Sequence, residues 1–402
     1  MTERVYIHVG LPKTGTTYLQ QCLLESREAL AADGVLVPGK NHHFQTEAFW
    51  DLLGRRLRDV DQQGVAGGWR RLLDVTTPWR GRSVVLSEEF LVNARKPHVK
   101  KVVQAFAPAE VHVVVTVRDL GRVLGSMWQQ ELSKGRTWTW AEFVAAVRDP
   151  EEGPATAGVA FWLRQDLARV LATWESAVPQ ERIHVVVVPP AGAPPTRLLE
   201  LFAEATDLDP ATLTPTTTRD NSSVGVVETE LLRRLNEGLG DRLNERQYLY
   251  LVNRVLKPAL HERASGTSFR LPASELAWVA EKGRETVALL AAGSYHVVGD
   301  PQHLVPEPGS AGPGTDPGDV GDAELASAAL TALTGTVEHY GNYWWRTRRR
   351  KEAPSAGGAE RAASGTRALA YRTRVGLLER ADRNRFLGWA ARRYLAWRTR
   401  TG

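Results

Sequence analysis

The sequence predicts an α/β protein in which a parallel β-sheet is flanked by helices, with a helical extension at the C-terminal end. Two observations predict this fold. Short runs rich in Val and Ile recur through the first half of the 402-residue chain, and longer segments with helical spacing alternate with them. Strands that are almost continuously apolar are buried on both faces, which is typical of a parallel sheet covered by helices.

Five segments are predicted to form strands, because each is rich in β-branched residues and is bounded by Gly, Pro or charged residues. They are residues 5–9, 35–37, 83–86, 111–117 and 183–188. Helical spacing follows the first strand at 17–31 and the fourth at 121–133, and the pattern is mostly helical from 226 to about 292.

Changes in amino-acid composition divide the C-terminal part of the chain into a linker and a basic extension. A stretch rich in Gly, Pro and Asp predicts a linker, and a helix is predicted over about 323–343, before an Arg cluster at 346–351. We therefore expect an α/β domain over residues 1–305, a linker over 306–323 and a helical, Arg-rich extension over 324–402.

The net charge of +5 is unevenly distributed along the chain. From Arg346 to the end there are 16 Lys and Arg residues against 4 Asp and Glu, a net charge of +12. The first 345 residues carry a net charge of −7. The high isoelectric point therefore belongs to the extension and not to the predicted domain.

Several classes of protein are excluded by composition. With 43% hydrophobic and 24% charged residues, the chain is neither wholly disordered, collagen-like nor a disulfide scaffold. No apolar run is long enough to span a membrane, and the first strand follows Met1 too closely for a signal peptide, so we expect a cytoplasmic protein. Cys22 is the only cysteine, which excludes an intrachain disulfide, and we expect it to serve packing.

The loop after the first strand, residues 10–17, has the sequence Gly-Leu-Pro-Lys-Thr-Gly-Thr-Thr. A loop between a buried strand and a helix N-terminus presents unpaired N–H groups at the positive end of the helix dipole. Its hydroxyls and one ammonium add donors without any carboxylate, so we expect a strongly anionic ligand. The alternative is an ordinary Gly-containing turn. Unlike the nucleotide triphosphatase loop, this one has Thr16 rather than Lys after its second Gly, which argues against Mg-ATP chemistry.

The segment from Pro12 to Tyr18 resembles the 5′-phosphosulfate loop of sulfotransferases that use 3′-phosphoadenosine 5′-phosphosulfate (PAPS). The resemblance implies the P-loop-like fold of that family, PAPS as the sulfuryl donor, and Lys13 as the group that stabilises charge on the leaving oxygen. It assigns donor binding to Pro12, Lys13, Thr14, Gly15, Thr16, Thr17 and Tyr18. Tyr18 stands where the family has an aromatic residue, often Trp, and offers a face for stacking on adenine.

A second motif follows the fourth predicted strand. Arg118 and Ser126 match the family's Arg and Ser eight positions apart, which bind the 3′-phosphate. One straight helix would separate them by about 12 Å, so the chain must turn between them for both to reach one phosphate. The alternative is a structural ion pair between Arg118 and Asp119. The resemblance extends with less force to about residue 305 and makes Arg219 a candidate donor ligand.

An acceptor hydroxyl needs a base, which the family supplies as His or Glu after a middle strand. The strand at 83–86 is followed by Glu88 and Glu89, at the edge where α/β sheets bind ligands. The resemblance favours Glu89 over Glu88, and a solvated acidic strand end is the alternative. His42 and His43 are weaker candidates for the acceptor pocket. Neighbours on an extended chain point to opposite sides, so at most one of them is expected to act.

The sequence thus predicts transfer of the sulfuryl group of PAPS to a hydroxyl or amine of a small-molecule, lipid or glycan acceptor, with release of PAP and no metal. A P-loop kinase or NTPase and a non-catalytic anion-binding adaptor are the alternatives. If 385–398 is helical, its aromatic residues share one broad arc: Phe386, Trp389, Tyr394 and Trp397. We expect such a basic tail to contact an anionic membrane, an anionic acceptor or a partner subunit, and no specific nucleic acid is predicted.

Overall fold

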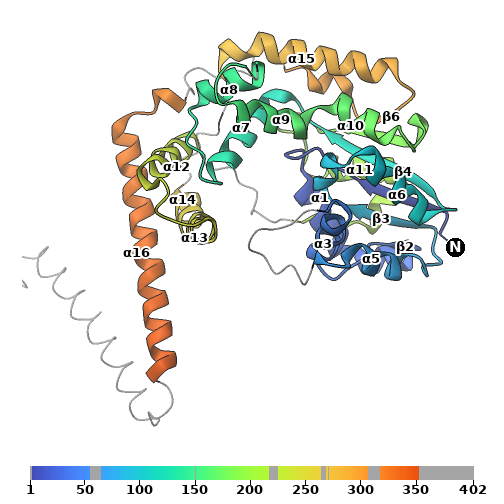
Figure 1. Cartoon of the computed structure of the whole chain (residues 1–402), viewed down its shortest axis with the longest axis horizontal. Helices are drawn as coiled ribbons and strands as arrows, with labels where there is room; N and C mark the ends of the chain where they lie inside the picture. Colours follow the sequence, from blue (N-terminus) through green and yellow to red (C-terminus); the bar gives the residue numbers. More distant parts are fainter. Residues whose placement is uncertain are drawn as a thin grey trace, which may run out of the picture. The chain divides into compact units, whose positions relative to one another are not determined.

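Six parallel strands form one sheet in the order β2-β3-β1-β4-β5-β6 (Figure 1). The computed structural model describes residues 2–54, 65–149, 151–216, 225–263, 269, 271–306 and 317–352. The strands are β1 Arg4–His8, β2 Val35–Leu36, β3 Ser83–Ser87, β4 Glu110–Val117, β5 Ile183–Val187 and β6 His296–Val298. The predicted parallel α/β fold is confirmed, and all five predicted strands are present with ends that differ by one residue at most. The three-residue β6 was not predicted.

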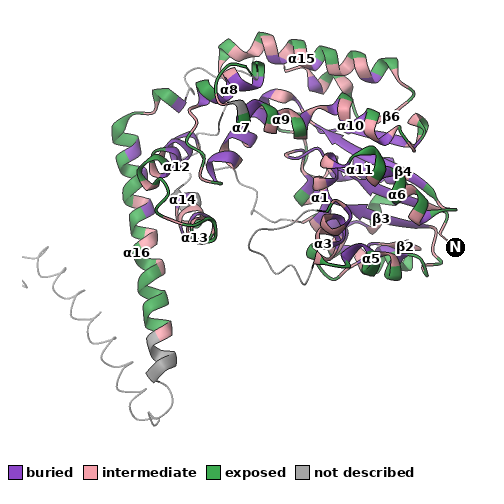
Figure 2. Ribbon diagram, viewed as in Figure 1, coloured by how far each residue is buried: buried purple, intermediate pink, exposed green. Residues whose placement is uncertain are grey.

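Helices cover both faces of the sheet, and Figure 2 shows the strands as buried. Residues such as Ile7 and Val113 face one helical layer, and their neighbours Tyr6 and Val114 face the other. The first layer contains α3 His43–Leu52, α5 Gly68–Thr76, α6 Lys96–Phe106, α10 Leu167–Trp174 and α15 Ala273–Ala292. The second contains α1 Thr16–Glu25, α2 Arg27–Ala32 and α11 Arg197–Thr206. Buried strands on both faces explain why the strand sequences lack a polar side.

The helical segment predicted at 17–31 is in fact two helices, α1 and α2, separated at Ser26. The Ser26 hydroxyl accepts a hydrogen bond from the backbone N–H of Thr214 at 2.7 Å, so a distant segment holds the break in place. Cys22 lies buried on α1, consistent with the predicted packing role.

A second group of helices packs on a core of its own around the aromatic residues Trp128, Trp140, Phe143 and Phe161. Its elements are α7 Leu120–Leu132, α8 Trp140–Arg148, α9 Ala155–Gln165, α12 Val226–Leu239, α13 Glu245–Leu251, a π-helix Val252–Leu256 and α14 Lys257–Arg263. The helical character predicted from 226 onward is confirmed over the described residues. Short 3₁₀ helices connect other elements: η1 Glu89–Asn93, η2 Gln180–Arg182, η3 Pro210–Thr212, η6 Pro301–Leu304 and η7 Pro317–Asp319.

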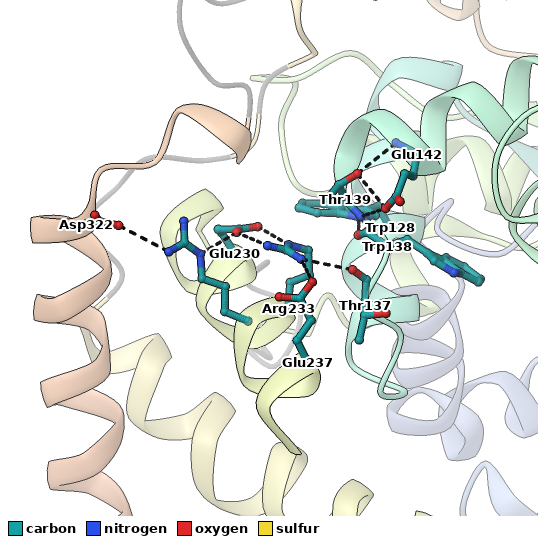
Figure 3. Close-up of polar contacts among 10 residues, drawn as sticks. Trp128, Thr137, Trp138, Thr139, Glu142, Glu230, Arg233, Glu237 and Asp322 are labelled. Carbon is teal, nitrogen blue, oxygen red and sulfur yellow. Dashed lines mark hydrogen bonds and ion pairs between the residues drawn. The ribbon is translucent and has the colours of Figure 1, made fainter. Parts of the chain in front are cut away.

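Helix α12 carries a buried ion pair (Figure 3). The Arg233 guanidinium lies 2.7 Å from the Glu230 carboxylate, and both side chains are about 90% buried. Glu230 also lies 3.0 Å from Arg234, which reaches Asp322 at 3.4 Å. The carboxylate of Glu230 raises the pKa of Arg233, so the pair stays charged. These contacts tie the helical group to the start of the last described helix.

The last described helix, α16, runs from Asp322 to Glu352. It starts where the sequence predicts and continues through the Arg cluster, well beyond the predicted end at 343. Residues 1–335 and 336–402 form two compact units, with the division inside α16. Most of the predicted linker and the whole segment 353–402, including the predicted aromatic arc, lie outside the described residues. Among the described helices none combines the length and apolar character required to cross a membrane.

Candidate anion-binding site

The order of strands determines what surrounds the loop after β1. Strand β1 lies between β3 and β4 and pairs in parallel with both. The carboxyl ends of the three strands therefore meet at one edge of the sheet, the edge where α/β sheets bind ligands. As a result the loop at 9–15 is flanked by Glu88 and Glu89 on the β3 side and by Arg118 on the β4 side.

The loop first continues the sheet and then turns sharply into α1. The N–H of Leu11 donates to the Thr116 carbonyl at 2.8 Å, and the N–H of Thr116 donates to Gly10 at 2.8 Å. Gly10, Lys13 and Gly15 have positive φ values of 86°, 68° and 90°. Because a helix offers no carbonyl to the N–H groups of its first turn, those of α1 remain for an anion at the positive helix end. The strand–loop–helix geometry predicted from sequence is present.

The threonine hydroxyls of the loop are used within the protein. The buried Thr14 hydroxyl donates to the Leu11 carbonyl and lies 2.6 Å from the hydroxyl of Thr116 on β4. The Thr16 hydroxyl donates to the Glu89 carboxylate at 2.7 Å. Thr14 therefore holds the loop against β4, and Thr16 connects α1 to the end of β3. The third predicted threonine, Thr17, is exposed.

Two further loop residues are held by neighbouring elements. The buried Pro12 accepts a hydrogen bond at its carbonyl from Nε2 of Gln165, at the end of α9, over 2.9 Å. Tyr18 packs partly against the core on the α11 side, and burial raises the pKa of its hydroxyl to about 12. Gln165 was not predicted, because nothing in its local sequence distinguishes it from other helix-end glutamines.

Two cations converge on the loop. Lys13 is half-buried, and burial lowers the pKa of its ammonium, while the nearby Glu89 carboxylate raises it. Arg118 follows β4 and donates from Nη1 to the Lys13 carbonyl at 3.2 Å. Burial lowers the pKa of Arg118 to about 10. Its Nε is buried and has no hydrogen-bond partner among the described residues, so the guanidinium has donor capacity left for a ligand.

The second predicted motif adopts the expected turn between strand and helix. Strand β4 ends at Val117 and α7 begins at Leu120, so Arg118 and Ser126 lie on different elements. The Ser126 hydroxyl donates to the Arg122 carbonyl at 2.9 Å. Asp119 caps α7 and pairs with Arg122, so its ion-pair partner is not Arg118 as the structural alternative supposed. Arg219 lies outside the described residues.

The two predicted carboxylates have different surroundings. Glu88 is 1% exposed and accepts hydrogen bonds from the Thr46 hydroxyl at 2.6 Å and the Phe90 N–H at 3.1 Å. Glu89 is half-buried and lies over the loop, where a Cβ on Gly10 would come within 3.3 Å of the Glu89 Cβ. Of the two, Glu89 contacts the predicted anion loop, through Thr16, while Glu88 is bound to α3 and the start of η1.

His42 and His43 lie at the start of α3. His42 has helical backbone angles, so the predicted extended chain at this point is wrong. Its Nε2 lies 3.5 Å from the Glu88 carboxylate, and burial lowers the pKa of the imidazole. His43 is exposed. The structure therefore brings His42, but not His43, to the end of β3.

A buried polar network supports the loop from inside the sheet and was not predicted. His8 Nδ1 lies 2.8 Å from the Ser87 hydroxyl, and Nε2 lies 3.1 Å from the Thr116 hydroxyl, which contacts Thr14. Burial lowers the pKa of His8 to about 3, so the imidazole is neutral at ordinary pH. The sequence contains one indication of this network, which is a polar residue near the carboxyl end of each of three otherwise apolar strands.

A cavity of about 440 Å³ adjoins the loop on the side of α7, α10 and α15. It is lined by Leu11 and Arg118 at the loop, by Gln165 and Leu167, and by Lys282 and Leu289 on α15. The described residues contain no group of three or more His, Cys, Asp or Glu side chains arranged to hold a metal ion.

Neither a protein-family model nor a curated protein matches the chain. Three solved chains match in structure. A sulfotransferase from Alicyclobacillus acidocaldarius has a TM-score of 0.37 and 13% identity, covering 63% of this chain and 97% of the other. The sulfotransferase domain from the curacin biosynthetic pathway has a TM-score of 0.28 and 14% identity, covering 54% and 79%. At these values neither likeness establishes a family for the chain.

Proposed function

We propose that the protein is a sulfotransferase that moves the sulfuryl group of PAPS to a hydroxyl or amine and releases PAP. One observation carries the proposal. The loop after β1 contains Lys13 and leads into the N-terminal end of α1. It lies between the cation Arg118 on one side and the carboxylate Glu89 on the other. Such a site has donors for a multiply charged anion and, next to them, a group that can accept a proton.

The donor set fits the charge of PAPS. The α1 N–H groups and Lys13 would hold the 5′-phosphosulfate, and Arg118, with Ser126 and Arg219 as candidates, would hold the 3′-phosphate. The buried Nε of Arg118, which has no partner among the described residues, supports this assignment, because a buried unpaired donor is costly unless a ligand satisfies it. Tyr18 would lie against the adenine.

In the proposed reaction the Glu89 carboxylate takes the proton of the acceptor as the new bond to sulfur forms. The bond between sulfur and the leaving phosphate oxygen breaks in line, and Lys13 stabilises the charge that develops on that oxygen. The Thr16 hydroxyl donates to the Glu89 carboxylate and holds it over the loop. The acceptor, whether a small molecule, lipid or glycan, remains a prediction.

Calorimetry with PAP and with Mg-ATP tests the donor assignment. We expect PAP to bind and Mg-ATP not to bind, and Lys13→Met or Arg118→Met to weaken PAP binding at least tenfold, which is about 1.4 kcal/mol. Lys101→Met, an exposed lysine on α6, is the matched control. Unchanged PAP affinity in both Lys13→Met and Arg118→Met would contradict the proposal, and binding of Mg-ATP in place of PAP would favour a kinase.

Turnover is measured as PAP released from PAPS in the presence of a panel of hydroxyl and amine acceptors. We expect acceptor-dependent release that is lost in Lys13→Met. Tight PAP binding without release for any acceptor would instead favour a non-catalytic anion-binding adaptor.

A further inference from the structure

The cavity beside the loop after β1 has a mostly apolar wall. Its volume of about 440 Å³ is within the range of about 300–1,000 Å³ that is typical of ligand pockets. Helices α7, α9, α10 and α15 contribute to the wall, and Figure 1 shows them together on one side of the sheet. The apolar lining includes Leu120, Val123, Trp162, Leu167, Leu289 and Leu304. A cavity of this size and composition suits a ligand with an apolar body.

Among the described residues, four charged side chains line the cavity, and three of them are compensated within the protein. Lys282 and Glu285 on α15 pair with each other at 2.8 Å. Asp166 caps α10 and accepts the Arg169 N–H at 2.9 Å, at the positive end of that helix. The fourth is Arg118, which forms no ion pair with a carboxylate of the described residues.

Arg118 therefore determines the charge of the ligand. Its guanidinium is half-buried, and the adjacent Asp119 pairs with Arg122 instead. Its Nε has no hydrogen-bond partner among the described residues. Because a half-buried cation without an ion pair is costly, an anion in the cavity would stabilise it. A carboxylate fits, since it carries a single charge and accepts two N–H groups of one guanidinium, whereas a dianion such as phosphate would require a second unpaired cation.

The cavity lies on the other side of the loop from Glu89. Its lining includes no described residue of β3, η1 or α3, and the order of strands places the loop between the two. The wall of the cavity nevertheless holds the loop. Gln165 donates to the Pro12 carbonyl at 2.9 Å, and Arg118 donates to the Lys13 carbonyl at 3.2 Å. A ligand in the cavity is therefore separated from the proposed base but contacts two residues that position the loop.

We propose that this cavity is a second binding site, which adjoins the site of the sulfuryl donor and takes an apolar carboxylic acid such as a medium-chain fatty acid. The carboxylate binds the Arg118 guanidinium, and the chain lies among the apolar residues of α7, α9, α10 and α15. Because the carboxylate and the anion at the loop share one guanidinium, each weakens the binding of the other. Binding of the acid does not depend on the proposed function, whereas its effect on PAP rests on it.

Calorimetry of the full-length protein with decanoate tests the site directly. Decanoate has no hydroxyl or amine, so it cannot serve as a sulfuryl acceptor. We expect it to bind, and we expect decanol, which lacks the charge, and acetate, which lacks the chain, to bind at least tenfold more weakly. Arg118→Met should remove the preference for decanoate over decanol. Equal affinity of the wild-type protein for decanoate and decanol, or no binding of decanoate, overturns the proposal.

A variant that fills the cavity shows where decanoate binds. Thr286 lines the cavity from α15, and its hydroxyl donates to the Lys282 carbonyl within the same helix, so Thr286→Trp removes no contact between elements. We expect it to abolish decanoate binding. Ala288→Trp, at an exposed position of the same helix, is the matched control and should bind decanoate as the wild type does. Undiminished binding to a Thr286→Trp protein with a normal urea unfolding transition overturns the proposal, and if this variant does not fold, Arg118→Met decides.

Competition between decanoate and PAP tests the shared guanidinium. Saturating decanoate should weaken PAP binding by a factor of about five or more, and saturating PAP should weaken decanoate binding by the same factor, because coupling between two sites is reciprocal. Unchanged PAP affinity in saturating decanoate would show that the carboxylate does not bind Arg118 and would overturn the proposal. If PAP does not bind the wild-type protein at all, the proposed function fails, while the titrations with decanoate and decanol still decide whether the cavity binds the acid.

Discussion

Adjacent residues at the end of β3 illustrate how two identical side chains acquire different roles. Glu88 has extended backbone angles and caps η1 with its own carboxylate, which directs the side chain to Thr46 on α3. Glu89 is the first residue of η1 and its side chain lies over the loop that follows β1, beside Gly10. The change in backbone direction between the two residues separates a structural carboxylate from one that can meet a ligand.

We predict that Glu89→Gln lowers turnover by about 10²- to 10⁴-fold, because the amide keeps an oxygen for the Thr16 hydroxyl but cannot accept a proton. PAP affinity should change little. Glu88→Gln should instead lower the free energy of unfolding by about 1–3 kcal/mol, since it weakens buried hydrogen bonds. Steady-state PAP release and urea unfolding of both variants separate the effects. Loss of turnover in Glu88→Gln with normal activity in Glu89→Gln would reverse the assignment.

Sequence reasoning found the loop residues but not the partners of their hydroxyls. The loop was predicted from a local pattern of Gly, Lys and Thr between a strand and a helix. The contacts of Thr14 with Thr116, of Thr16 with Glu89 and of Pro12 with Gln165 join residues 73 to 153 positions apart. Such contacts depend on the order of strands in the sheet, which no local pattern contains.

At the scale of elements, the turn from β1 into α1 depends on glycine. Gly10 has a φ of 86°, in the left-handed region, and rigid neighbours surround the position where a Cβ would lie. Those neighbours are the backbone N of Pro12 at 3.3 Å and the Cβ and Cα of Glu89 at 3.3 and 3.4 Å. Close approach of the loop to Glu89 therefore requires a residue without a side chain.

We predict that Gly10→Ala destabilises the protein by about 1 kcal/mol or more from backbone strain and also lowers turnover, because the added methyl displaces Glu89 from the loop. Gly192→Ala is a close control: its φ is 87°, and nothing lies within 4 Å of the added Cβ. Gly192→Ala should lower the free energy of unfolding through backbone strain alone and leave turnover unchanged. Equal turnover in the two variants would show that the contact between Gly10 and Glu89 does not position the carboxylate.

The ends of strands and helices were predicted best where the local sequence alone determines them. Five buried strands were found because continuous β-branched runs are distinctive. The break at Ser26 was missed, since it depends on the backbone of Thr214. Helix α16 continues past the predicted end because Arg and Lys favour helices and no Pro follows until Pro354.

At the scale of the whole molecule, the fold class followed from sequence because alternation of buried strands and helices has few solutions. The order of the strands did not follow, although it decides that Glu89 and Arg118 lie on opposite sides of the loop. The uneven charge can also be located: the acidic domain has two half-buried cations, Lys13 and Arg118, at the loop, while the basic excess begins at the end of α16. The isoelectric point therefore reports on the extension and not on the site.

Two neutral histidines make the stability of the molecule depend on pH. Burial lowers the pKa of His8 to about 3. For His184, burial and the neighbouring His112 and His296 lower the pKa to about 4. The ring nitrogens of His184 lie 2.9 Å from His112 and 2.8 Å from His296, on the adjacent strands β4 and β6. In the unfolded chain these histidines have a pKa near 6.5. At pH values between the folded-state pKa and about 6.5, the unfolded state therefore binds more protons than the folded state.

We predict that the free energy of unfolding is highest above about pH 6.5 and falls as the pH is lowered, by up to about 1.4 kcal/mol per pH unit for each histidine. The sign follows because a folded-state pKa below the unfolded one makes acid favour unfolding, until the pH passes the folded value of about 4 for His184 and about 3 for His8. Urea unfolding followed by tryptophan fluorescence from pH 7.5 to 4.5 measures the slope. His184→Gln, which keeps a polar group near the position of Nε2, should flatten the slope by one histidine's share. If His184→Gln retains the full slope, His184 binds protons equally in the folded and unfolded states over this range, and its surroundings do not hold its folded pKa below the unfolded value.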